Sequence, residues 1–165
     1  MPGVYWIAVT VHVLAALGWL GGMFFLALVG APVLRQVEPP ALRQQLFQQL
    51  GLRFRSVGWA LLAVLLATGP VVLHYRGLLR WSGVLGAPAF WRTATGHALA
   101  AKLAAVTVML VVSLVHDFLL GPVAGRMAPG SPGALRMRRR AAWLARVNAL
   151  VGIVLVVAAV RLARG

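Results

Sequence analysis

The chain contains no cysteine and only two acidic residues, Glu38 and Asp117, among its 165 residues. The absence of cysteine excludes disulfide bonds, thiolate metal sites and cysteine nucleophiles. The chain also offers no paired carboxylates, no Ser-His-Asp spacing signature and no glycine-rich phosphate loop. Hydrolysis and phosphoryl transfer are therefore disfavoured, and a binding or electron-transfer role is favoured over an enzymatic one. If the chain is an enzyme, a haem-dependent oxidoreductase is the expected class.

Apolar residues occupy 61% of all positions, far more than a soluble domain of this length carries. Four apolar blocks reach the ~20 residues that a helix needs to cross a hydrocarbon core. Backbone groups in lipid must find their hydrogen bonds within the segment, so each block should be a helix. We therefore predict an all-α integral membrane four-helix bundle. It forms a single transmembrane domain over residues 1–165, with spans at about 4–31, 56–75, 98–121 and 142–163.

Lysine and arginine are abundant, and the formal net charge is +14. Most of the basic residues lie between or beside the spans, so membrane lipid, and not nucleic acid, is the expected partner. The connections after the first and third spans hold more arginines than the middle connection and the two ends. By the positive-inside rule, both termini lie outside a bacterial cytoplasmic (inner) membrane.

The connections also carry local signals. Residues 39–54 alternate apolar residues with Arg and Gln at helical spacing, which predicts an interfacial amphipathic helix lying flat between the first and second spans. In the middle connection, Trp81, Phe90 and Trp91 are expected at headgroup depth, where this loop can cover a site in the outer leaflet. Residues 126–140 predict a flexible basic turn that binds lipid.

The first span places His12 and Trp19 on one helical stripe. Beside this stripe, Gly18 and Gly22 form a small-xxx-small pair that lets a neighbouring helix approach closely. The same pair makes a homodimer a candidate assembly.

The next two spans each have one distinctive face. In the second span a stripe of small residues suits tight packing or a flat ligand, and its outer end is a histidine. Its members are Ser56, Ala60, Ala63, Ala67 and His74. In the third span one face collects the residues that form a polar seam. These residues are Lys102, Met109, Ser113 and His116.

Depth separates the ionisable residues into an outer and an inner group. At ~1.5 Å of rise per residue, His12, Lys102 and His74 can converge in the outer half of the bundle. Burying an ionisable residue within a span is costly, by ~2.5 kcal/mol or more for a lysine, so a functional role is the default expectation.

The inner group contains His116 and Asp117, which we expect to form an ion-pair network with Arg146 near the inner end of the third span. His97 begins the third span and points away from the polar seam, so an interfacial role is expected. His97 and His116 are retained as lower-ranked metal ligands.

Histidine ligation of haem or copper in the bundle is the chemistry that remains. Neutral imidazole suits both, whereas copper(I) also favours soft thioether ligands, and no methionine joins the outer group easily. The residues therefore favour haem b, with His12 and His74 as axial ligands and Trp19 beside them. The haem propionates would be held by basic residues near the outer surface. These are Lys102, Arg76, Arg80 or Arg92.

Three stretches of the chain resemble the copper resistance D (CopD) family of bacterial membrane proteins. They read "HVLAALGWLGGMFFLALVGAPVLR", "KLAAVTVMLVVSLVHDFLLGP" and "RVNALVGIVLVVAAVRL". The resemblance implies a membrane protein that handles copper. A related four-helix family, the HemJ-type protoporphyrinogen oxidases, pairs a first-helix histidine with a third-helix lysine and is thought to bind b-type haem. By that resemblance, His12 and Lys102 are the matching positions.

Three functions follow as hypotheses: a haem-binding membrane protein for haem handling or one-electron transfer, a copper-handling protein, and a HemJ-like oxidase. An absorption spectrum separates them, because only a haem protein shows a Soret band.

Overall fold

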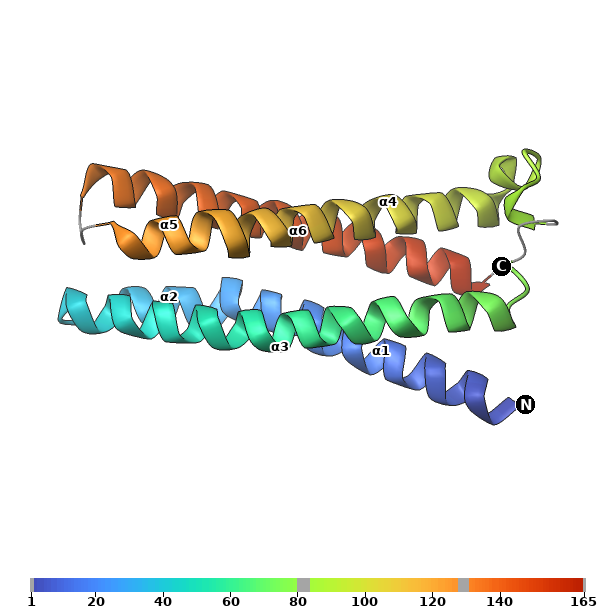
Figure 1. The fold of residues 1–165 in the computed structure, drawn as a ribbon, viewed down its shortest axis with the longest axis horizontal. Coiled ribbons are helices and arrows are strands. Elements are labelled where there is room, and N and C mark those ends of the chain that lie inside the picture. Colours follow the sequence, from blue (N-terminus) through green and yellow to red (C-terminus); the bar gives the residue numbers. More distant parts are fainter. Residues whose placement is uncertain (1, 80–83, 128–130, 165) are drawn as a thin grey trace.

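The computed structural model describes residues 2–79, 84–127 and 131–164, which form a long bundle of helices running back and forth (Figure 1). The first connected stretch consists of α1 (Pro2–Phe25), a π-helical turn η1 (Leu26–Gly30) and α2 (Ala31–Arg35). The remaining elements are α3 (Pro40–Tyr75), the 3-10 turn η3 (Phe90–Arg92), α4 (Ala94–Leu114), the π-helical turn η4 (Val115–Leu120), α5 (Gly121–Arg126) and α6 (Pro132–Arg164).

The prediction of four spans is confirmed. Within the described part of the chain, four helices are long and apolar enough to cross a membrane: Gly3–Arg35, Pro40–Tyr75, Ala94–Val123 and Arg139–Ala163. Large apolar side chains cover their outer surface, as in Trp6 (64% exposed) and Leu28 (72% exposed). Such a surface is stable in hydrocarbon and would aggregate in water.

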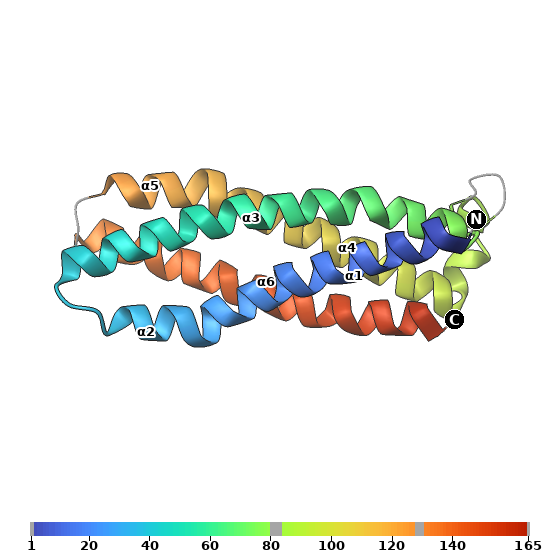
Figure 2. The same ribbon diagram turned by 90° about the horizontal axis from the view of Figure 1, so that it is seen from below.

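The bundle is built from two helix pairs. Helix α1 packs mainly on α3, and α4 packs mainly on α6, while weaker contacts join α1 to α6. Both termini lie at the same end of the bundle, which we call the terminal end (Figures 1 and 2). The opposite end holds α2 and α5, and we call it the α5 end. An even number of spans places the two termini together, as the sequence predicted.

Two predicted connections differ from the structure. Residues 40–54 are helical, but they continue without a break into the second span as part of α3 and do not form a separate helix lying flat. The basic segment expected as a flexible turn is helical from Pro132 onward, where it begins α6. In both cases a helix that has already nucleated extends more easily than a new one starts.

The close approach predicted for the two glycines of the first span is confirmed, and α3 is the helix that uses it. A Cβ atom on Gly18 would lie 3.3 Å from Leu61 Cδ1, and one on Gly22 would lie 2.6 Å from Phe54 Cε2. Within the chain, this face is therefore packed against α3.

A small core in the middle of the bundle consists of Trp19, Leu62 and Met109, one residue from each of three helices. A second core lies at the terminal end, where Phe90 and Trp91 of η3 pack against Leu99 and its neighbours. There the indole Nε1 of Trp91 donates to the Leu85 carbonyl oxygen at 2.9 Å. The middle connection therefore covers the terminal end of the bundle. Arg80 and Trp81, which were predicted to lie near the headgroups, are outside the described residues.

Candidate functional site

His12 is held in one tautomer by α3. Its Nδ1 lies 2.8 Å from Thr68 Oγ1. The single hydroxyl proton of Thr68 is donated to the Val64 carbonyl oxygen at 2.7 Å, so the hydroxyl must accept from His12. Nδ1 therefore carries the ring proton, and Nε2 keeps a free lone pair. The ring also lies against α3 at Gly69, where an added Cβ would be 3.6 Å from Cε1.

Two cations lie in the same half of the bundle as this histidine. Lys102 on α4 is close enough to His12 for their charges to interact, and Arg76 is close enough to Lys102. Arg76 also donates to the Ala163 carbonyl oxygen at 3.5 Å, near the end of α6. Among the described residues, neither acid, Glu38 nor Asp117, lies at this end. The terminal half of the bundle thus holds an unbalanced positive charge.

The structure does not bring His74 to this group. His74 lies six residues beyond Thr68, so it points to a different side of α3, and it is exposed with its ring edge against Tyr75. The stripe of small residues that ends in His74, expected to pack or to hold a flat ligand, is exposed along its whole length. Leu62 and Thr68 face the other helices instead.

The other predicted residues of the terminal half lie as follows. Trp19 is buried on the same side of α1 as His12, as predicted. His97 lies in the first turn of α4 with an exposed side chain. Arg92 is exposed at the end of η3.

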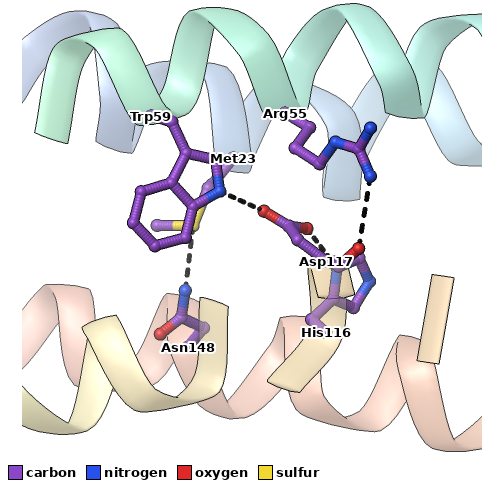
Figure 3. Close-up of polar contacts among 6 residues, drawn as sticks. All are labelled: Met23, Arg55, Trp59, His116, Asp117 and Asn148. Carbon is purple, nitrogen blue, oxygen red and sulfur yellow. Dashed lines mark hydrogen bonds and ion pairs between the residues drawn. The ribbon is translucent and has the colours of Figure 1, made fainter. Parts of the chain in front are cut away.

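A second polar cluster lies toward the α5 end, centred on Asp117 in the π-helical turn η4 (Figure 3). Trp59 Nε1 donates to Asp117 Oδ2 at 2.9 Å, and His116 Nδ1 lies 2.8 Å from Asp117 Oδ1. Arg55 donates to the Asp117 backbone carbonyl oxygen at 3.3 Å and lies over the ring of Phe118. The wider backbone of a π-turn is common at functional positions in helices.

This cluster corrects the predicted ion-pair network. Asp117 takes its partners from α3 and from the neighbouring His116, whereas Arg146 on α6 is exposed and forms no ion pair with Asp117. The reason is that Arg146 lies on the exposed side of α6, whereas the Asp117 side chain is only 19% exposed and points toward α3.

His116 is oriented as a ligand would be. A carboxylate can only accept, so the ring proton lies on Nδ1 and the lone pair of a neutral ring lies on Nε2. Histidines that bind metals are commonly held by a carboxylate in this way. The side chain is 41% exposed, so Nε2 is accessible. His116 and His12 therefore each keep Nδ1 occupied and Nε2 available, in opposite halves of the bundle.

Asn148 on α6 is buried, with 5% of its surface exposed. Its Nδ2 donates to Met23 Sδ at 3.4 Å, whereas Oδ1 has no hydrogen-bond partner among the described residues (Figure 3). An unpaired buried amide oxygen costs roughly 1–3 kcal/mol.

The described residues contain no group of three or more His, Cys, Asp or Glu that could hold a metal ion. Ligands for a metal would therefore have to include groups other than these four residue types, such as a thioether, an amide oxygen or an external ligand.

The family model of copper resistance protein D matches residues 48–162. This chain belongs to the copper resistance D family. An uncharacterized protein of Aquifex aeolicus (strain VF5) is 33% identical over 156 residues, which cover 93% of this chain and 92% of that protein. No solved structure matches the chain.

Sequence reasoning missed two residues that position the histidines of this copper resistance D family member. Thr68 fixes His12, and Trp59 fixes Asp117. Thr68 had a usable signal, because it is the one hydroxyl residue between Val57 and Leu73. A tryptophan within a span carries no comparable signal, since it also suits the lipid-facing and core positions.

Proposed function

We propose that this protein handles copper in the membrane and that His116 presents imidazole Nε2 to the ion. The observation that supports this is the 2.8 Å contact between His116 Nδ1 and Asp117 Oδ1 in a member of the copper resistance D family. Asp117 fixes the tautomer and the orientation of the ring. Trp59, in turn, orients the carboxylate from α3. With the termini outside, as the arginine distribution predicts, His116 lies near the cytoplasmic end.

Copper titration of the purified protein tests this proposal. Asp117→Asn keeps the shape but removes the charge that orients the ring, so copper affinity should fall about 10- to 100-fold. His116→Ala should lower it at least as far. His97→Ala is the matched control, because its side chain is exposed at the other end, and it should bind copper as the unmodified chain does. Equal affinities for the His116 and His97 variants would contradict the proposal.

A haem b site at His12 is the second candidate, for haem handling or one-electron transfer. The specific observation is the positive charge of Lys102, which interacts with a histidine whose Nε2 is free, and of Arg76, which interacts with Lys102. A cationic pair disfavours a bound copper ion and favours the propionates of a haem. In this arrangement Nε2 of His12 would hold the iron and Lys102 would hold a carboxylate. His74 does not face His12, so the second axial position would need another ligand.

An absorption spectrum tests the haem proposal. A Soret band that disappears in His12→Ala and persists in His97→Ala would support it. A colourless protein supplied with haem during expression would refute it. Turnover of protoporphyrinogen by the coloured protein would identify a HemJ-like oxidase.

A further inference from the structure

The centre of the bundle contains a buried amide oxygen that none of the residues described by the structure satisfies. Asn148 is 5% exposed, and its Oδ1 has no partner among the described residues. Its Nδ2 donates to Met23 Sδ on α1, which fixes the amide plane between α1 and α6 (Figure 3). A thioether sulfur has a second lone pair, so this contact leaves Met23 able to bind another group.

A second thioether lies in the core cluster against which Met23 packs. Met109 on α4 is 1% exposed and belongs to the central core with Trp19, against which Met23 also packs. Its Cε would lie 3.6 Å from a Cβ atom added to Gly152, which is one turn beyond Asn148 on α6. Methionine has three rotatable bonds, and the site proposed next requires Met109 to turn its sulfur toward the amide.

We propose that Met23 Sδ, Met109 Sδ and Asn148 Oδ1 form a binding site for copper(I) in the middle of the bundle. This inference rests on the copper-handling function proposed above. It adds a site of different chemistry that lies deeper in the bundle than His116. The three donors come from three separate helices, so the ion would join α1, α4 and α6.

The donor set selects the ion. Two thioethers are soft ligands that favour copper(I) over hard cations such as magnesium or calcium. All three donors are neutral, and neither Asp117 nor Glu38 is among them, so a monovalent ion suits the site better than a divalent one.

Copper(I) supplied anaerobically, in competition with the chelator bicinchoninate, provides the test. Met23→Leu with Met109→Leu conserves the volume of the core and removes both sulfurs. This pair should lower the affinity of the central site at least tenfold and abolish copper–sulfur scattering in the X-ray absorption spectrum. Met137→Leu, at the α5 end of α6, is the control and should change neither. Sulfur scattering that survives in the double variant would overturn the inference.

Asn148→Leu separates a binding role from a structural one. Replacing an unsatisfied amide with an apolar side chain of similar size should leave folding intact or improve it. Copper(I) affinity should nevertheless fall, and unchanged affinity would refute the role of Oδ1.

His116→Ala distinguishes this inference from the proposed function. Loss of nitrogen scattering with retained sulfur scattering supports both sites. Unchanged nitrogen scattering would show that His116 is not a copper ligand, and it would leave the inference about the central site unaffected. Loss of sulfur scattering in His116→Ala would show a single shared site and would overturn the separate central one.

Discussion

Replacing Trp59 with phenylalanine should destabilise the bundle by removing one hydrogen bond. The Nε1 donor lies 2.9 Å from Asp117 Oδ2, and the Asp117 side chain is 19% exposed. Hydrogen bonds to charged groups contribute about 1.5–3 kcal/mol in soluble proteins. Those between membrane helices average about 0.6 kcal/mol and reach about 1.7 kcal/mol. A charged acceptor at the end of a membrane bundle places the expected loss at about 1–2 kcal/mol.

Unfolding in mixed micelles, followed by far-ultraviolet circular dichroism during a titration with dodecyl sulfate, measures this loss. Trp143→Phe is the matched control, because Trp143 is 62% exposed and should lose less than about 0.5 kcal/mol. Phenylalanine also packs less well than tryptophan against Phe118, whose ring centroid lies 5.7 Å from that of Trp59.

A double-mutant cycle removes this packing contribution. Trp59→Phe should cost less in an Asp117→Asn background, with a coupling energy of about 1 kcal/mol. A coupling energy below about 0.3 kcal/mol, the level at which independent sites add, would refute the reasoning.

Three further predictions concern packing, the outer charge and topology. Gly96→Ala should destabilise the protein by more than about 2 kcal/mol, because the added Cβ would collide with the backbone of η3. Gly51 has open space around it, so Gly51→Ala should be neutral or slightly stabilising. Thermal unfolding in detergent measures the stability of both variants. If haem binds, Lys102→Met should weaken its retention without changing the spectrum of the axial ligand, and a changed spectrum would indicate lysine ligation. A cysteine introduced at Ser131 should react only with reagents on the cytoplasmic side, and one at Ala89 only with external reagents; the reverse pattern would overturn the predicted orientation.

The sequence alone determined that the chain crosses the membrane four times, because span length and backbone hydrogen bonding in lipid depend on local composition. It also determined which ionisable residues lie within spans, and on which stripe of the first helix His12 and Trp19 fall. These properties need only the helical repeat and the apolar run lengths. Helix ends were less predictable, since α3 and α6 extend through segments whose composition suggested connections.

Only the tertiary structure decided which side of each helix faces its neighbours. A helix surrounded by lipid is apolar on every side, so no amphipathic pattern marks its packing face. The sequence therefore could not show that the small stripe ending in His74 faces outward, although its composition suited packing. Nor could it show that Thr68 turns inward and fixes His12. The tertiary packing likewise determined the partners of Asp117. Trp59 lies 58 residues away in the sequence, and only the packing of α3 against η4 brings its indole to the carboxylate.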